Sequence, residues 1–398
     1  PQTPNRRLNK VTLRSHTLEV RFHNSNLDKR FARLKVGDFI AVKRPFPAVV
    51  PRRDKQGRFL SSASANIYIT FSQDVRLERV VSYAAPQMTF VASGSEAVVL
   101  DSCRIVRKPG TNRLIAGNSD GAHFKSLTVM PQVLNSTFEA LMDDSINFKI
   151  SSEVVREVQG PRVRLDHGEI VTNDLVIQPG QSLSFLGGPG FQHLGYAKVK
   201  AVERIRYREV WVTLEGPVAA LAVGDLAFLR PITDAVVSGC EFRTQLKTAL
   251  VVHGPPTVIS NSAFADVAYG LHAFFNSRVE GPPPFNIRVT NCEFLRPSAA
   301  AVALFLPSTN SLPTGISSLI ADQCRVTVEG NRGLLLSAIN QQKNELRNWR
   351  VTVRDNRTKA ELIRVRGCPA IHEENVSFVP SPPPQLDFRP KAESKGTH

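Results

Sequence analysis

Gly239-Cys-Glu-Phe242, Asn261-Ser-Ala-Phe264 and Asn291-Cys-Glu-Phe294 repeat one short pattern. In each copy a cysteine or serine stands two positions before a phenylalanine. Side chains two positions apart on a β-strand point to the same face, so the small and the bulky residue of each copy point inward together. The same pattern recurs in Ser102-Cys-Arg-Ile105, Ser136-Thr-Phe138 and Gln323-Cys-Arg-Val326.

The spacing of these copies indicates a solenoid. Phe264 follows Phe242 by 22 residues, Phe294 follows after 30 more, and Val326 after 32 more. An imperfect period of this size, with short strands and Asn, Asp or Gly turns, is typical of an all-β, right-handed parallel β-helix. The alternative is a β-propeller, which needs a steadier period of about 40 residues or more and four strands per blade.

The cysteines follow the same repeat. Four of the five, Cys103, Cys240, Cys292 and Cys324, share the small inward position, and Cys368 lies outside it. None forms the C-x-x-C pair that is typical of a zinc site. We therefore expect stacked small hydrophobic residues and neither a metal nor a disulfide framework.

One segment interrupts the repeat, because 104 residues separate Phe138 from Phe242. Within it, short alternating strands are separated by Gly and Pro, which is typical of a small antiparallel barrel. Leu34–Ile40 resembles one of these strands, at Val223–Leu226. The expected organisation is a partial barrel or lead-in strands at 1–45, coils at 46–149, an inserted barrel at 150–232, coils at 233–380 and a disordered tail at 381–398.

Composition restricts the partners. The chain has 398 residues and a net charge of +15, from 50 Lys and Arg against 35 Asp and Glu. The basic residues are dispersed and no zinc-finger or RNA-binding motif occurs, so nucleic acid is not expected as a partner. Two explanations of the positive charge remain: a basic solvated surface, or attraction to an acidic or sulfated glycan. No apolar run approaches 18 residues, so no membrane span is expected. The start of the chain shows no signal peptide, and its abrupt beginning leads us to expect a processed or truncated chain.

Three aspartates carry the chemistry expected of this chain. Asp120 lies in Asn118-Ser-Asp-Gly121, and Asp143 and Asp144 follow it by 23 and 24 residues. If the intervening chain makes one coil, all three carboxylates lie on one face, as acid/base cleavage of a glycosidic bond requires. Repulsion among them raises at least one pKa and keeps one carboxyl protonated, as a general acid must be. The residues alone do not show which of the three aspartates is the general acid. This chemistry needs no metal.

Further candidates surround the aspartates. Strict alternation would turn His123 away from Asp120, whereas a turn at Gly121 would bring both to one side. Phe274-Phe275 could form a sugar-stacking platform or pack in the core. The other candidates for binding sugar hydroxyls, each with an ordinary surface residue as the alternative, are Lys149, Arg243, His272, Asn276 and Glu280.

The order of these motifs resembles glycoside hydrolase family 110, the inverting exo-acting α-1,3-galactosidases. The resemblance rests on Leu34-Lys-Val-Gly-Asp38, Asp120-Gly-Ala-His-Phe124, Met142-Asp-Asp-Ser-Ile-Asn147, the insertion and Asn286-Ile-Arg-Val-Thr-Asn-Cys-Glu-Phe294. It implies a β-helix with barrel insertions and no cofactor, with Asp120 as general acid and Asp143 with Asp144 activating water. It also implies an oligosaccharide or polysaccharide substrate, a secreted or periplasmic location and a possible homodimer.

The chain departs from this family in one respect that affects substrate contacts. Ser145 follows the aspartate pair, and Phe148-Lys149-Ile150 replaces the His-Gly ending of that strand. A lysine beside the site favours a related enzyme acting on another, anionic sugar as the first alternative. A noncatalytic β-helix that only binds glycans is the second. An inverting enzyme is expected to separate its acid and base by roughly 6.5 to 9.5 Å.

Overall fold

The computed structural model describes residues 8–14, 17–22, 52–53, 59–60 and 65–380, with gaps at 168–176, 188–191, 207–208, 276–280, 283–285, 306–317, 331–332, 340–342, 356 and 369–370. The chain divides into two compact units, Pro1–Arg44 and Pro45–His398. In the first unit, β1 (Leu8–Arg14) and β2 (Thr17–Phe22) form an antiparallel hairpin. The strand expected at 34–40 and the tail expected at 381–398 lie outside the described residues, so the first barrel stays a prediction.

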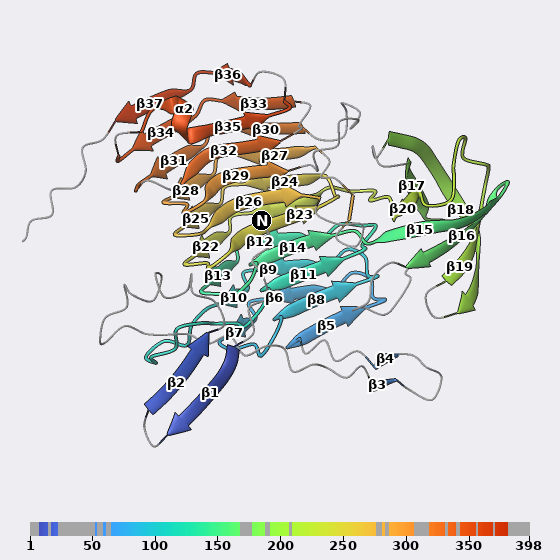
Figure 1. Cartoon of the computed structure of the whole chain (residues 1–398), viewed down its shortest axis with the longest axis horizontal. Coiled ribbons are helices and arrows are strands. Elements are labelled where there is room, and N and C mark those ends of the chain that lie inside the picture. The colour runs from blue at the N-terminus through green and yellow to red at the C-terminus, as the bar shows by residue number, and fades with distance from the viewer. Residues whose placement is uncertain are drawn as a thin grey trace, which may run out of the picture. The chain divides into compact units, whose positions relative to one another are not determined.

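The second unit contains a parallel β-helix, as the repeat predicts. Three nine-stranded sheets are each built from parallel neighbours that come from successive coils (Figure 1). A propeller blade would instead consist of antiparallel neighbours, so that alternative is wrong. No described helix is long and apolar enough to cross a membrane.

The sheet that carries the aspartates, called here the site sheet, consists in spatial order of β35 (Ile363–Arg366), β32 (Leu334–Ile339), β29 (Ala300–Phe305), β26 (Tyr269–Phe274), β23 (Thr248–His253), β14 (Ile146–Lys149), β11 (Ala122–Lys125), β8 (Phe90–Ser93) and β5 (Ile67–Thr70). The phenylalanine sheet consists of β37 (Ser377–Pro380), β34 (Arg350–Val353), β31 (Arg325–Val328), β28 (Glu293–Leu295), β25 (Ala263–Ala265), β22 (Glu241–Arg243), β13 (Thr137–Glu139), β10 (Arg104–Ile105) and β7 (Val81–Ser82). The third sheet consists of β36 (His372–Glu374), β33 (Lys343–Arg347), β30 (Ser318–Asp322), β27 (Ile287–Thr290), β24 (Thr257–Ser260), β21 (Ala235–Ser238), β12 (Gln132–Leu134), β9 (Val99–Asp101) and β6 (Arg76–Glu78).

The phenylalanine sheet has the register that the repeat predicts. Phe138 pairs with Phe242, Phe242 with Phe264, and Phe264 with Phe294. Their rings stack with centroid distances of 5.3, 4.8 and 4.7 Å. These rings are almost completely buried in the core of the β-helix. Stacked aromatic pairs contribute to stability beyond the area that they bury.

The cysteine positions form a second internal column beside the rings. Cys103, Cys240, Cys292 and Cys324 directly precede strands of the phenylalanine sheet, and each is at most 2% exposed. Serines fill the intervening rungs: the Ser136 hydroxyl accepts a hydrogen bond from the Cys103 amide at 3.0 Å. All four belong to the core of the β-helix, so the predicted cysteine ladder is confirmed.

The strands inserted between β14 and β21 close into an antiparallel barrel, with its own core. Phe275 packs in that core and is 8% exposed, so it is not available for a sugar-stacking platform. In barrel order the strands are β15 (Ser152–Gln159), β16 (Arg162–His167), β19 (Glu209–Leu214), β18 (Gln192–Arg206), β17 (Ser182–Gly187) and β20 (Leu226–Leu229).

Among the described residues, the first coil begins with β5. The described strands before it, β3 (Arg52–Arg53) and β4 (Phe59–Leu60), pair antiparallel with one another, and the coils start at β5. At the other end, the short helix α2 (Lys359–Leu362) precedes β35. It is held by a capping box in which the Thr358 amide donates to the Glu361 carboxylate at 2.6 Å.

Candidate active site

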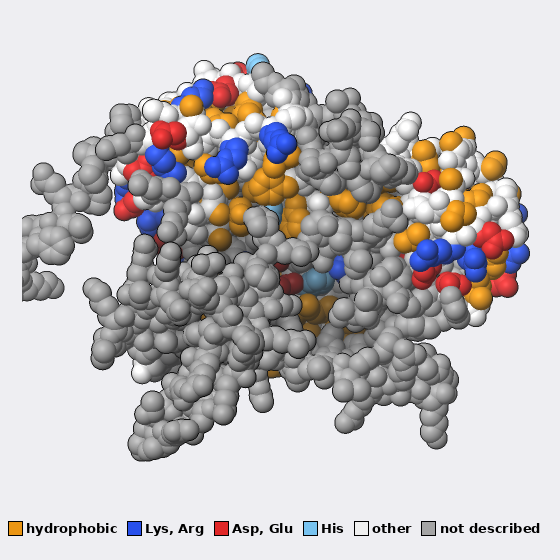
Figure 2. Space-filling view, viewed as in Figure 1, with side chains coloured by type: hydrophobic (Ala, Val, Ile, Leu, Met, Phe, Trp, Pro, Cys, Tyr) orange, Lys and Arg blue, Asp and Glu red, His pale blue; other side chains and the backbone are white. Residues whose placement is uncertain are grey.

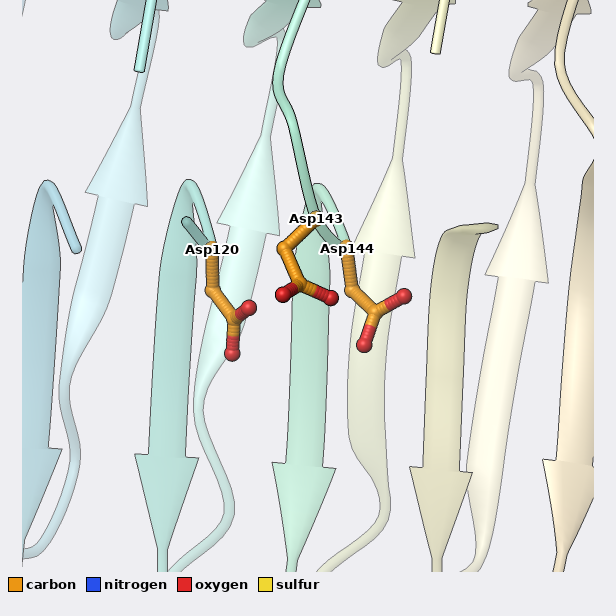
Figure 3. Close-up of side chains that lie close together, drawn as sticks. All are labelled: Asp120, Asp143 and Asp144. Carbon is orange, nitrogen blue, oxygen red and sulfur yellow. The ribbon is translucent and has the colours of Figure 1, made fainter. Parts of the chain in front are cut away.

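The three aspartates lie at the starts of two neighbouring strands, β11 and β14. Ala122 pairs with Ile146, and the Gly121 amide donates to the Asp144 carbonyl at 3.0 Å, which sets Asp120 beside Asp144 on adjacent coils. Asp143 precedes Asp144, and Figure 3 shows the three carboxyl groups side by side. One oxygen of each lies within 4.8 Å of one oxygen of each of the others.

The register explains why the carboxyl groups meet. Asp120 and Asp144 occupy equivalent positions on adjacent coils, and neighbouring strands lie roughly 4.8 Å apart. The predicted acid–base separation of roughly 6.5 to 9.5 Å refers to whole carboxyl groups and stays a prediction.

Gly121 places His123 on the same side as Asp120. A Cβ at Gly121 would lie 2.8 Å from Phe138 Cδ1 and 2.9 Å from Leu141 Cδ1, so this residue points into the core. Ala122 is also buried in the core, which breaks the alternation and leaves His123 on the outer face. The turn considered from the sequence therefore occurs at Gly121, where a side chain has no room.

Two of the three carboxylates have a nitrogen partner. Asp120 Oδ2 lies 2.7 Å from His123 Nδ1, and Asp143 Oδ1 accepts from Lys247 Nζ at 2.7 Å. Among the residues that the structure describes, no cation forms an ion pair with Asp144, which accepts a hydrogen bond from the Thr248 side chain. The three carboxylates thus have three different environments.

The environment of Asp144 favours its protonated form. Burial raises its pKa well above the usual value of 3.8, and the negative charges of Asp120 and Asp143 raise it further. Lys247 and the Thr248 hydrogen bond oppose that rise without cancelling it. This is the pKa perturbation that like charges in a shared site produce.

Lys247 is a site residue that the sequence reasoning missed. Its side chain is 53% exposed. Burial lowers its pKa, but the charge and hydrogen bond of Asp143 outweigh this effect, together with the charges of Asp144 and Asp120, so its pKa is raised overall. The only available signal was its place directly before β23, one coil after the aspartate pair.

The outer face of the site sheet continues from the aspartates in two rows. His123, Asn147, Val251 and His272 are successive partners in the first row. Lys125, Lys149 and His253 are partners in the second. In the view of Figure 2, acidic, histidine and basic side chains lie next to one another between the grey atoms.

His272 and Phe274 lie on this face, two strands beyond β14. The His272 ring is 4.2 Å from the ring of Phe274 and 4.6 Å from that of Tyr269. Burial lowers the pKa of His272 to about 3, so the ring is neutral near pH 7, and its buried Nε2 has no hydrogen-bond partner among the described residues. A contact of either residue with a ligand stays a prediction.

The remaining candidates from the sequence do not join the aspartates among the described residues. Arg243 lies on the phenylalanine sheet and pairs there with Glu139 at 3.7 Å and with Glu241 at 4.0 Å, so its guanidinium is not directed at the aspartates. Asn276 and Glu280 lie outside the described residues.

Three clustered carboxylates also have the oxygen donors that hard divalent cations prefer. Here His123 and Lys247 already engage one oxygen each of Asp120 and Asp143. Both contacts would compete with a cation for these oxygens. That the site works without a metal remains a prediction.

The sequence matches no known family model. It is similar to two curated proteins named Alpha-1,3-galactosidase B. The protein of Bacteroides thetaiotaomicron is 21% identical over 255 residues, which are 62% of this chain and 42% of that protein. The protein of Akkermansia muciniphila is 25% identical over 199 residues, which are 48% of this chain and 23% of that protein. The matched part therefore spans less than half of either relative.

Two solved structures resemble parts of this chain at low sequence identity and low TM-score. The family 28 exopolygalacturonase of Yersinia enterocolitica covers 80% of this chain with 47% of its own, at a TM-score of 0.34 and 14% identity. The tailspike protein gp49 of Pseudomonas phage LKA1 covers 77% of this chain with 70% of its own, at a TM-score of 0.21 and 11% identity.

Proposed function

We propose that this chain is a glycoside hydrolase that releases a terminal α-linked galactose from a glycan. The observation that carries the proposal is the cluster of Asp120, Asp143 and Asp144, in which one carboxyl favours its protonated form. Cleavage of a glycosidic bond needs a protonated and an ionised carboxyl around one anomeric carbon. The names of the two curated relatives support galactose and an α-1,3 linkage.

We assign the general acid to Asp144. A general acid must hold its proton near the working pH, and Asp144 is the carboxyl whose pKa burial and two negative neighbours raise. The resemblance assigned this role to Asp120, but Asp120 faces His123, which can donate Nδ1–H to an ionised carboxylate. The ionised Asp120 and Asp143 then position and activate the attacking water.

We propose inversion at the anomeric carbon, the outcome that the family resemblance implies. Inversion needs room for a water on the face of the sugar opposite the leaving group. Three carboxylates offer this if two hold the water and the third reaches the leaving oxygen. The anomeric configuration of the first product distinguishes a single displacement by water, which inverts the configuration, from two displacements through a covalent intermediate, which retain it.

Galactosyl-α-1,3-galactose is the substrate for the first test, with proton NMR of the sugar released in the first minutes. We expect the β-anomer first, from an α-linked substrate. The α-anomer first would require a covalent intermediate and would exclude the proposed role of Asp120 and Asp143. Absence of turnover, with glycan binding retained when all three aspartates are replaced by Asn, would point instead to a noncatalytic binding protein.

α-Galactosyl fluoride tests the assignment of the acid, because fluoride leaves without protonation. Each of D120N, D143N and D144N should lower turnover of the disaccharide by roughly a hundredfold to ten-thousandfold. Only D144N should retain most of its activity on the fluoride. If D120N is the variant that retains it, the acid is Asp120.

A further inference from the structure

Four aromatic side chains, called here the aromatic cluster, contact one another on the outer face of the site sheet. Tyr269, His272 and Phe274 belong to β26, and Phe305 belongs to the neighbouring β29. The ring centroids of Tyr269 and His272 are 4.6 Å apart and those of His272 and Phe274 4.2 Å, and both pairs stack. Phe305 meets the His272 ring edge-on at 5.3 Å.

The cluster lies on the outer face because two successive residues point into the core. A Cβ at Gly270 would lie 2.6 Å from Phe294 Cδ1, and Leu271 is fully buried. Tyr269 and His272 therefore share the outer face, and all four rings of the cluster are only partly buried. Figure 2 shows hydrophobic side chains gathered over β26 and β29. Partly exposed aromatic surface beside a polar site is typical of a place where a ligand binds.

The register sets this cluster two strands from the general acid proposed above. Tyr269 pairs with Thr248 on β23, and the Thr248 side chain donates a hydrogen bond to Asp144. Two inter-strand spacings of roughly 4.8 Å, about 9.6 Å in all, separate Asp144 from Tyr269. The Tyr269 amide also donates to the Lys247 carbonyl at 3.2 Å, and the Lys247 side chain binds Asp143. The backbone thus fixes Tyr269 relative to the aspartates.

We propose that the aromatic cluster binds the sugar that leaves when the aspartates cleave the glycosidic bond. This inference rests on the proposed glycosidase function and deepens it, because it gives the bound glycan a direction. The general acid protonates the leaving oxygen, so the leaving sugar lies beside Asp144. It extends from there over β23 to β26, and the terminal galactose lies toward Asp120 on the other side.

The chemistry of the cluster suits a neutral pyranose. A pyranose has C–H groups on one face that pack on aromatic rings, while the hydroxyls at its edge keep their hydrogen bonds. Because burial lowers the pKa of His272 to about 3, the cluster is uncharged near pH 7 and has no attraction for an anion. Over β23, between Asp144 and Tyr269, the outward side chains are Thr248 and Val251, which are smaller than the rings. The substrate class is therefore an oligosaccharide and not a simple galactoside.

The test compares galactosyl-α-1,3-galactose with α-galactosyl fluoride, which has no leaving sugar. Y269L should lower kcat/KM for the disaccharide roughly tenfold, the order expected for the loss of one stacked ring, and leave kcat/KM for the fluoride unchanged. Y269F keeps the ring and should resemble the wild type on both substrates. Y68L is the matched control and should change neither value. Tyr68 is 40% exposed on the same face, two strands from β11 on the side away from β26.

The outcomes separate this inference from the proposed function. The ratio of the two kcat/KM values does not depend on the fraction of folded protein, and F274L replaces Y269L if that variant does not fold. Equal losses on both substrates, or an unchanged value for the disaccharide, overturn the aromatic subsite and leave the glycosidase proposal standing. A loss in Y68L but not in Y269L also overturns it, because the leaving sugar would then lie on the side of Asp120.

A binding measurement decides if the disaccharide is not turned over. Calorimetric titration of the wild type and Y269L with galactosyl-α-1,3-galactose then replaces kinetics. Weaker binding to Y269L than to Y269F supports a sugar subsite without catalysis. Equal binding to both variants, or no binding to the wild type, overturns the subsite.

Discussion

Asp120 Oδ2 and His123 Nδ1 lie 2.7 Å apart on one side of the site sheet, although an unbroken strand would place residues three apart on opposite sides. The contact exists because Gly121 and Ala122 both turn inward. A histidine that donates Nδ1–H to a carboxylate restricts the orientation of that carboxylate. His123 is thus a positioning residue, and its effect depends on a glycine.

Replacing Gly121 by Ala should lower kcat at least tenfold. The new Cβ would lie 2.6 Å from the Ser145 carbonyl oxygen and under 3 Å from two core side chains, so the strand start must shift and carry Asp120 with it. G216A is the matched control, since a Cβ there meets nothing within 4 Å. Full activity of folded G121A would show that the position of Asp120 does not depend on this close packing.

The pH dependence should follow the raised pKa of Asp144. As general acid, Asp144 is active while protonated, so kcat/KM should fall as the pH rises through its folded-state pKa. Because that pKa is raised above 3.8, the folded state also loses stability as the pH rises from 3.8 to the raised pKa, an interval in which only the unfolded state ionises. D144N should therefore melt at a higher temperature than the wild type at pH 8 and not at pH 3. Equal melting temperatures at both values would contradict the raised pKa.

Lys247 should determine where the alkaline limb of that profile lies. Its charge lowers the pKa of Asp144, so K247M should move the limb to higher pH while reducing turnover, because Asp143 loses its 2.7 Å ion pair. K247R keeps the charge and should restore the position of the limb. A loss of activity with an unmoved limb in K247M would mean that Lys247 acts on the substrate instead.

The stacked phenylalanines should contribute strongly to stability. Phe264 is 1% exposed and lies between the rings of Phe242 and Phe294. Phe264→Ala should reduce the free energy of unfolding by about 3 to 5 kcal/mol, measured by denaturant titration. Phe71→Ala, at a site that is 51% exposed, should have little effect. A cost below about 1 kcal/mol at Phe264 would indicate that the column collapses around the missing ring.

The column of rings and cysteines was predictable because strand periodicity acts locally. A small residue two positions before a large one specifies the inward face without knowledge of the rest of the chain, so the pairs that follow Phe138 could be aligned by eye. The same reasoning placed the two aspartate segments on neighbouring coils. It left the side on which His123 lies open, because that depends on the inward turn at Gly121, where Phe138 and Leu141 leave no room for a side chain.

Lys247 and Asn147 could not be identified in the same way. Asn147 belongs to the site through the register of β11 with β14. Lys247 belongs to it through the register of β14 with β23, two strands that the barrel insertion separates in the sequence. Arg243 was chosen because it follows the catalytic coil along the chain, yet it belongs to β22 of the phenylalanine sheet and not to the site sheet. Proximity in the sequence does not predict proximity in space wherever the chain passes from one sheet to the next.

The barrel begins and ends at one place on the β-helix. Ser152, at its first strand, pairs with Phe228, at its last, and beyond it Phe242 still stacks on Phe138. Closing a loop of 104 residues in an unfolded chain would oppose that contact entropically, whereas a barrel that folds first reduces the loop to a few residues. Assembly of the coils around the aspartates should thus wait for the barrel, and pulse-labelled hydrogen exchange should protect Val212 before Phe242. Because the first and last strands of the barrel lie side by side, the insertion could be shortened, replaced or deleted in evolution while the coils that carry the aspartates keep their register.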